Sequence, residues 1–133
     1  MDTPDPPTTL LVISNDERLA YLLNRYAEQS GCRVIHRPSA PWVAEIRQLK
    51  PSAIIFSSLE ILQTAQTLIE DLSVAEVPVL ACVALADEVR AREFGADACL
   101  VHPLTYENFQ GALSSVCPGK PNSSGFQAKI SGF

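Results

Sequence analysis

The sequence predicts a doubly wound α/β domain in which helices cover both faces of a five-stranded parallel sheet. Three apolar runs are typical of strands buried on both faces, and each ends in a small neutral residue: 10–13 before Ser14, 53–56 before Ser57 and 78–83 before Ala84. Segments with apolar residues at helical spacing separate these runs, and short loops connect them. Strands alternating with helices over short connections require right-handed crossovers, and therefore a parallel sheet.

The first half of the chain contains two strands and two helices that lead to the third strand. After the strand at 10–13, a capping box at 14–17 begins an amphipathic helix that Gly31 ends. A short strand follows at 33–36. Pro41 then starts a second helix, with Trp42 among its apolar positions, and this helix stops before Pro51.

The second half continues the alternation after the strand at 53–56. Ser58 is suited to cap one long helix that runs to residue 72, and the fourth strand follows at 78–83. Asp87 is placed to cap a short fourth helix, and Thr105 to cap a fifth helix after a strand at 99–101. For a doubly wound chain of this length, the flavodoxin-like strand order 2-1-3-4-5 is the commonest arrangement.

The length of 133 residues fits one domain with flanking segments. Residues 1–8 include three prolines and no periodic pattern, which predicts a disordered leader. The ordered domain is expected over 9–117. Residues 118–133 have the composition of a flexible tail, and they contain the triplet Ser-Gly-Phe twice.

Charge and hydropathy exclude several classes of protein. A net charge of −5 with only 10 Lys and Arg residues opposes nucleic-acid binding. No apolar stretch is long enough to cross a membrane, and the N-terminal residues lack the pattern of a signal peptide, so we expect a cytoplasmic protein. The four cysteines show no C-x-x-C spacing and are expected to be reduced.

Four segments resemble the receiver domain of two-component response regulators, and together they cover about residues 9–117. They occur in the order of that family: 10–16 (family pattern I-L-V-V-D-D-E), 50–59 (K-P-D-L, three apolar residues, D-L), 77–84 (I-P-V-I, two apolar residues, T-A) and 95–104 (G-A-D-x-Y-L-x-K-P-F). The resemblance implies the CheY-like version of the flavodoxin-like fold. The stretch from Val83 to Gly95 is a few residues shorter than its family counterpart.

The resemblance also implies a phosphorylation pocket, and the chain departs from the family pattern at all six of its functional positions. Ser57 stands for the phosphoacceptor Asp, Ser14 and Asn15 for the acidic pair, Val83 for the switching hydroxyl residue, His102 for the Lys and Cys99 for the aromatic switch. His102 and Pro103 occupy the position of a cis X-Pro turn that is frequent in the family.

These departures predict a pocket that has lost its chemistry. Neutral Ser14 and Asn15 bring no charge to a Mg²⁺ ion, and Asp16 lies one position too far along and is equally suited to cap the next helix. Val83 has no hydroxyl to reach a phosphoryl oxygen. A phosphoserine at Ser57 would be a different species from an acyl phosphate. We therefore expect no phosphorelay, no enzymatic activity, no metal and no cofactor.

Other interpretations of the same residues remain open. Ser57, His102 and Asp16 include the residue types of a hydrolytic triad, but no G-x-S-x-G motif surrounds Ser57. His102 with Asp16 and Asp97 has no metal-binding spacing rule. Near neutral pH, His102 is suited to pH sensing or anion binding, and a hydrogen-bonded loop histidine is the simpler alternative.

Two functional hypotheses follow. The first is a pseudo-receiver that signals without phosphorylation, by contact with a protein partner such as a sensor kinase or a downstream effector. The resemblance implies a contact face formed by the fourth helix, fifth strand and fifth helix, about residues 87–116, which also serves for homodimers. The second is a small-molecule sensor that uses the emptied pocket near Ser14, Asn15, Ser57, Val83 and His102.

Overall fold

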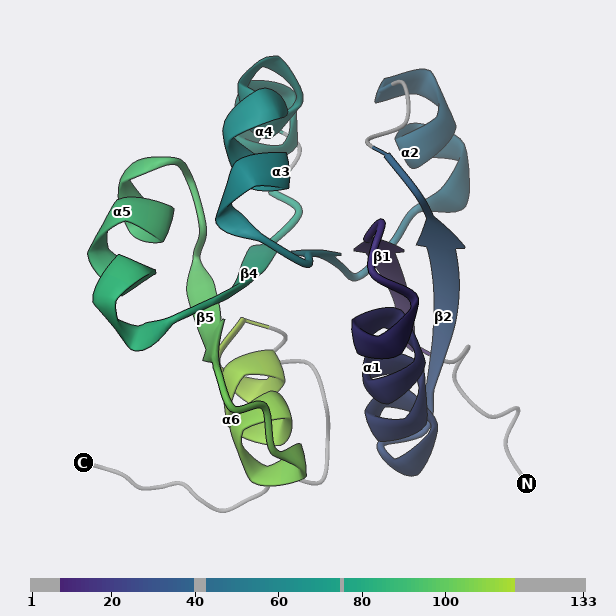
Figure 1. The fold of residues 1–133 in the computed structure, drawn as a ribbon. Coiled ribbons are helices and arrows are strands. Elements are labelled where there is room, and N and C mark those ends of the chain that lie inside the picture. The colour runs from purple at the N-terminus through teal and green to yellow at the C-terminus, as the bar shows by residue number, and fades with distance from the viewer. Residues whose placement is uncertain (1–7, 40–42, 75, 117–133) are drawn as a thin grey trace, which may run out of the picture.

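A computed structural model describes residues 8–39, 43–74 and 76–116, and its centre is a five-stranded parallel sheet (Figure 1). The strand order is β2-β1-β3-β4-β5, which confirms the predicted fold class and strand order. The strands are β1 (Thr8–Ile13), β2 (Cys32–Arg37), β3 (Ala53–Phe56), β4 (Val79–Val83) and β5 (Ala98–Val101). Thr8, expected in the leader, is the first residue of β1.

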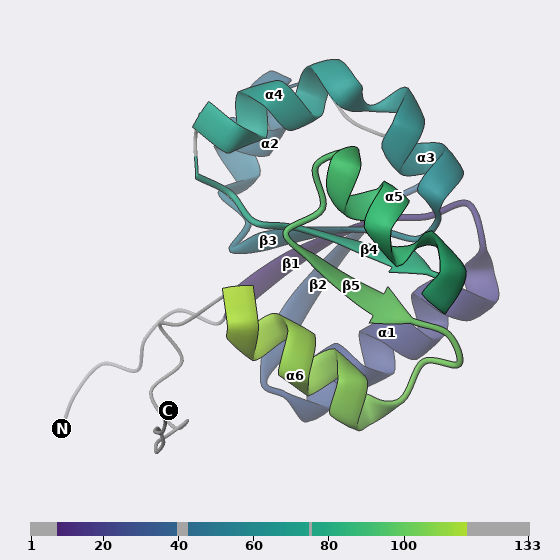
Figure 2. The same cartoon turned by 90° about the vertical axis from the view of Figure 1, so that its left-hand side faces the viewer.

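Helices cover both faces of the sheet. Figure 2 shows two of them on one face, α1 (Glu17–Gln29) and α6 (Tyr106–Val116). The other face carries α2 (Val43–Leu49), α3 (Leu59–Thr64), α4 (Gln66–Val74) and α5 (Glu88–Glu93), with a 3₁₀ turn, η1 (Leu85–Asp87), directly before α5.

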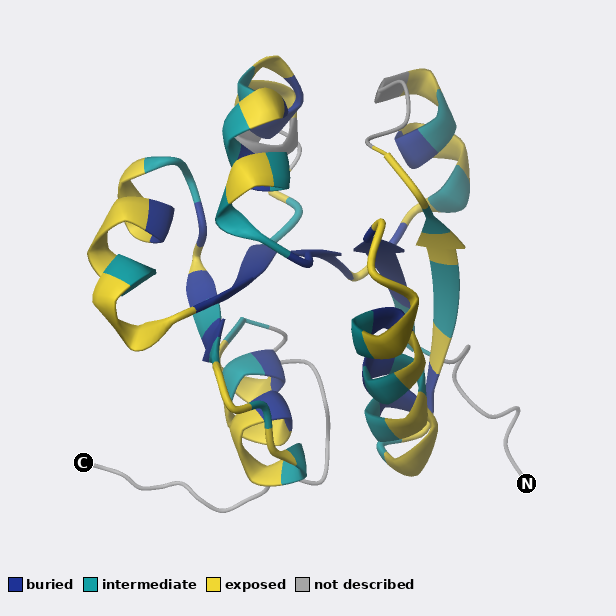
Figure 3. Ribbon diagram, viewed as in Figure 1, coloured by how far each residue is buried: buried dark blue, intermediate teal, exposed yellow. Residues whose placement is uncertain are grey.

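The period-two alternation of each strand divides the core into two layers. Leu10 and Val12 of β1 pack with Leu23 of α1 and Phe109 of α6, whereas Leu11 belongs to the opposite layer. The central strands β3 and β4 are buried throughout, as the dark blue ribbons of Figure 3 show. This two-sided burial explains why their sequences are continuous apolar runs.

The first helix begins differently from the predicted capping box. Asp16 is the N-cap, and its Oδ1 accepts hydrogen bonds from the backbone N–H groups of Arg18 and Leu19, at 3.0 and 3.2 Å. The Ser14 hydroxyl instead bonds to the backbone of Asp16. Two further predicted caps are confirmed, since Ser58 Oγ accepts from Ile61 N and Thr105 Oγ1 from Asn108 N.

The single long helix expected after Ser58 is wrong, because the segment forms α3 and α4 with a break at Ala65. The Gln66 side chain explains the break. Its Nε2 donates to the carbonyl of Leu62, the acceptor that the Gln66 backbone would use in a continuous helix, and also to the carbonyl of Phe94.

Asp87 occupies the expected N-cap position of α5, but without a capping bond from its side chain. The same residue ends η1. The helix expected fourth in the sequence is therefore α5, preceded by a 3₁₀ turn, and the helix expected last is α6. Pro41, Trp42, Cys117 and the leader and tail at 1–7 and 118–133 lie outside the described residues.

Candidate functional site

Backbone hydrogen bonds bring the predicted site residues to one edge of the sheet, at the carboxyl ends of the strands. Ser57 N donates to the carbonyl of Ile13, and His102 N donates to the carbonyl of Val83, both at 3.0 Å. These bonds extend the β1–β3 and β4–β5 pairings by one residue. The edge is the place where a doubly wound sheet binds ligands.

At the end of β1, the polar groups are occupied by local structure. Ser14 is buried, and its hydroxyl donates to the carbonyl of Asp16 and accepts from the amide of the same residue, both at 3.0 Å. Asn15 is exposed. The Asp16 carboxylate is bound to the amino end of α1, as described above. The one acid among these three residues is thus already engaged in a helix cap.

Ser57 lies at the end of β3 and is only 5% exposed. Within the described part of the chain, its side chain forms no hydrogen bond, although its backbone N–H is paired with β1. A buried hydroxyl without a protein partner is unusual, because desolvation of such a group costs about 1–3 kcal/mol. A water molecule or another polar group is the ordinary way to satisfy it.

The positions on β4 and β5 are apolar or weakly polar. Val83 is buried in the core layer on the α3–α5 side of the sheet. Cys99 is half-buried on the same side, and its Sγ lies 3.8 Å from the carbonyl oxygen of Glu88 in α5. The side chain at the family's aromatic switch position is therefore a small thiol that contacts α5.

Burial keeps the thiols of β4 and β5 protonated. Burial, reinforced by Cys99, raises the pKa of Cys82 to about 12. Burial also raises the pKa of Cys99; Arg92 lowers it and Glu88 raises it to smaller extents. Because the thiolate is the reactive form, neither cysteine is activated as a nucleophile. Cys32, Cys82 and Cys99 are all free thiols, as the sequence predicts for these three.

The loop after β5 contains a cis peptide bond between His102 and Pro103, as the family resemblance implies. Both residues are exposed. The backbone N–H of His102 is held by Val83, as stated above. The structure thus places His102 at the expected edge of the sheet, with its side chain accessible to solvent.

Sequence analysis missed the part that His36 plays at this edge. His36 Nε2 lies 2.9 Å from the carbonyl oxygen of Ser14, and since a carbonyl only accepts, the imidazole donates. Ser14 N in turn donates to the carbonyl of Arg37 at 3.0 Å. The end of β2 therefore fixes the end of β1. Only the position of a polar ring at a strand end hints at this contact in the sequence.

The alternative catalytic and metal arrangements find no support in the side-chain contacts. No hydrogen bond joins Ser57, His102 and Asp16 to one another, and Asp16 is used as a cap. Among the described residues, no group of three or more His, Cys, Asp and Glu side chains is arranged to hold a metal ion. Asp97, the third residue of the suggested metal set, accepts a hydrogen bond from Val79 N at 2.8 Å.

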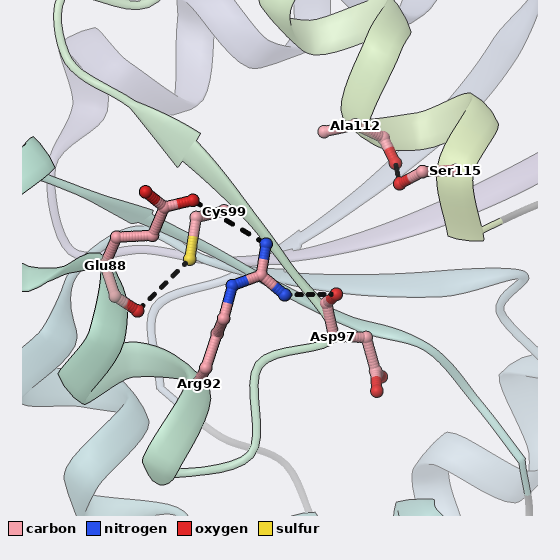
Figure 4. A network of polar contacts seen from close by, with 6 residues as sticks. All are labelled: Glu88, Arg92, Asp97, Cys99, Ala112 and Ser115. Atoms are coloured by element: carbon pink, nitrogen blue, oxygen red, sulfur yellow. Dashed lines mark hydrogen bonds and ion pairs between the residues drawn. The ribbon is translucent and has the colours of Figure 1, made fainter.

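A second surface, the η1–α5–β5–α6 face, corresponds to the predicted contact face. Arg92 links α5 to the start of β5, since one guanidinium nitrogen lies 3.6 Å from Glu88 Oε2 and another donates to the carbonyl of Asp97 at 3.1 Å (Figure 4). Leu85 of η1 and Val89 of α5 are 70% and 68% exposed. They are four residues apart in the sequence, and both side chains are accessible to a partner.

The parallel sheet with strand order β2-β1-β3-β4-β5 and helices on both faces is the fold of response regulator receiver domains. No protein-family model matches the sequence, and no curated protein matches it. The likeness is with solved structures. None of the helices in the described part of the chain is long and apolar enough to span a membrane.

Three solved structures illustrate this likeness. The chemotaxis protein CheY4 of Vibrio cholerae is 14% identical, with a TM-score of 0.68 over 84% of this chain and 99% of that one. A response regulator receiver protein from Burkholderia phymatum is 20% identical, with a TM-score of 0.65 over 84% and 95%. A Burkholderia pseudomallei response regulator, determined with a phosphorylated aspartic acid, a calcium ion and citrate, is 25% identical, with a TM-score of 0.59 over 80% and 66%.

Proposed function

We propose that this protein is a pseudo-receiver that takes part in signal transduction by phosphorylation-independent contact with a protein partner. One observation carries the proposal: a receiver fold whose sheet edge bears Ser14, Ser57 and Val83 where phosphotransfer needs acids and a hydroxyl. The partner we propose is a sensor kinase or a downstream effector. Free cysteines at three positions fit a reducing compartment, and we place the protein in the cytoplasm.

Phosphotransfer fails on this edge for physical reasons. A phosphoryl group carries about two negative charges, and receivers offset them with Mg²⁺ and a Lys. Ser14 and Asn15 are neutral, and the Asp16 carboxylate is bound to two helix amides. The Burkholderia pseudomallei response regulator has a phosphorylated aspartic acid. The position that its family motif indicates here is Ser57, whose hydroxyl is buried and cannot form an acyl phosphate.

The η1–α5–β5–α6 face supports the proposed contact with a protein partner. Leu85 and Val89 are large apolar side chains that the fold leaves exposed, and Arg92 ties α5, which carries Val89, to the start of β5. Covering them with a partner would gain about 1.5–3 kcal/mol each. A partner that presents an apolar side chain to this pair would therefore bind without any change at Ser57.

Capture on matched variants tests the proposal. Proteins retained by the wild-type chain are compared with those retained by a Leu85→Ser, Val89→Ser double variant and by a Tyr21→Ser control, because Tyr21 on α1 is also 64% exposed. A specific protein that is retained by wild type and Tyr21→Ser and lost from the double variant supports the proposal. Equal retention on all three chains contradicts the assigned face. If the chain itself is the protein retained, the face is a homodimer interface.

A second candidate function is a small-molecule sensor that uses the emptied pocket. The observation that favours it is the buried Ser57 hydroxyl, which has no hydrogen-bond partner within the described residues. A polar ligand at the sheet edge would supply one. In a thermal-shift screen, a ligand at about 100 times its dissociation constant would stabilise the fold by about 2.7 kcal/mol. Loss of that shift on Ser57→Ala would assign the ligand to this pocket.

A further inference from the structure

A cavity of about 670 Å³ lies at the amino edge of β4 and β5, at the opposite end of the strands from the degenerate pocket. Its volume is within the range of about 300–1,000 Å³ that is typical of binding sites. Ile69 of α4, Val77 and Val116 at the end of α6 supply apolar walls, and Glu70 and Glu76 supply acidic ones.

The region around this cavity is fixed in place by its own polar contacts. The Asp97 carboxylate accepts from Val79 N, and Arg92 donates to the Asp97 carbonyl, so the loop before β5 is tied to both β4 and α5. Figure 4 also shows that the hydroxyl of Ser115, which lines the cavity, donates a hydrogen bond to the carbonyl of Ala112 within α6. The cavity is thus a formed feature of the fold.

Acidic side chains outnumber basic ones in the cavity wall. The lining includes Glu70, Glu76 and Asp97 and one cation, Arg92, which is paired with Glu88. Among the described residues, the two ion pairs are Arg37–Glu45 and Arg92–Glu88, and neither includes Glu70 or Glu76. A cationic occupant would therefore be favoured at these two carboxylates.

The sequence that follows the last residue of the cavity wall has a cationic composition. Val116 lines the cavity, and the sequence continues for 17 residues, 117–133, with Lys120 and Lys129, without Asp or Glu, and with two phenylalanines. We propose that residues 117–133 return to this cavity, with Phe126 against the apolar walls and Lys129 facing Glu70 and Glu76. Phe126 is ten residues beyond Val116, a length that extends to at most about 33–36 Å, so the segment reaches any part of the cavity.

The covalent connection makes a modest contact sufficient. A segment tethered by a short linker has an effective concentration on the order of millimolar. A contact with a Kd of about 1 mM as a separate peptide would therefore be about half formed within the chain. The apolar walls of the cavity suit one aromatic side chain, and the carboxylates of Glu70 and Glu76 suit one or two cations.

Amide resonances of the full-length chain test the proposal. The ¹H–¹⁵N positions of Val77 and Ala96, both in the cavity wall, are compared among wild type, Phe126→Ala, Lys129→Glu and a Gln127→Ala control. We expect the first two variants to move both resonances in one direction and the control to leave them in place. Resonances of β1 report that the fold is unchanged, since the substitutions lie outside it.

Variants on the cavity side provide an independent arm. Glu70→Gln with Glu76→Gln is expected to weaken the effect of Lys129→Glu, whereas Glu60→Gln on α3, outside the cavity lining, leaves it intact. Unchanged Val77 and Ala96 resonances in every tail variant would overturn the proposal. Shifts that disappear on dilution would overturn it as well, because they would assign the segment to the cavity of a second copy.

Discussion

Substitution of the three glycines within the described residues by alanine tests the fold quantitatively. Gly95, before β5, has φ +110°, and a Cβ added there would lie 2.5 Å from Ile69 Cγ2. Gly31, after α1, has φ +78° and open space around the added Cβ. Gly111, within α6, also has open space and no positive φ. The three sites thus separate backbone strain from steric overlap.

The expected changes in the free energy of unfolding differ in sign and size. Gly111→Ala should stabilise by about 0.5–1 kcal/mol, because alanine is the better helix former. Gly31→Ala should destabilise by about 1–2 kcal/mol from left-handed backbone strain alone. Gly95→Ala adds about 1–3 kcal/mol of overpacking against Ile69 to a strain of similar size, and we expect a total of about 2–5 kcal/mol.

Urea unfolding followed by far-UV circular dichroism measures all three values on the full chain. The predicted order of stability is Gly111→Ala, wild type, Gly31→Ala, Gly95→Ala. If Gly95→Ala were no less stable than Gly31→Ala, the packing of α4 against the loop before β5 would be wrong. The cavity wall described above would then be wrong too, since both Ile69 and Gly95 line it.

Three further outcomes follow from the described contacts. Asp16→Ala should lose about 1 kcal/mol of stability because it removes an N-cap. Asp87→Ala removes no capping bond and should change stability by less than about 0.5 kcal/mol. Equal losses of the two variants in urea unfolding would contradict the cap assignment. Phe109→Ala should lose about 3–5 kcal/mol, since the side chain is buried beside Tyr26; a loss below 1 kcal/mol would contradict this packing. Cys82 has a pKa of about 12 in the folded chain and near 9.0 when exposed. Its contribution to stability is therefore complete below pH 9 and falls by about 1.4 kcal/mol per pH unit as pH rises towards 12. Between pH 8 and pH 10, the free energy of unfolding should fall less for Cys82→Ala than for wild type, and an equal fall would contradict the raised pKa.

The architecture was predictable because strong, local signals agreed with one another. Fully apolar strands such as 53–56, turn residues such as Gly31 and caps such as Ser58 each predict one element, and their alternation leaves one common topology. The break at Ala65 was not predictable in this way. It depends on a hydrogen bond from Gln66 to Phe94, a residue 28 positions away in the sequence.

The candidate site was predictable in its position and less so in its contacts. The carboxyl ends of parallel strands meet at one edge, so Ser14, Ser57 and His102 could be placed together before any coordinates. Helical periodicity does not indicate that Asp16 replaces Ser14 as the cap, nor that His36 holds the Ser14 carbonyl. The Asp16 cap is a local choice between neighbouring polar residues, whereas the His36 contact depends on the pairing of β1 with β2, which brings distant residues into register.

The central claim is that the pocket at Ser57 has lost the capacity for phosphoryl chemistry while the fold is retained. The most direct measurement is the ¹H–¹⁵N spectrum of the full-length chain with Mg²⁺ and beryllofluoride, which mimics an acyl phosphate. The account predicts an unchanged spectrum at Ser14, Ser57 and Val83. A saturable, Mg²⁺-dependent shift centred on Ser57 would contradict it.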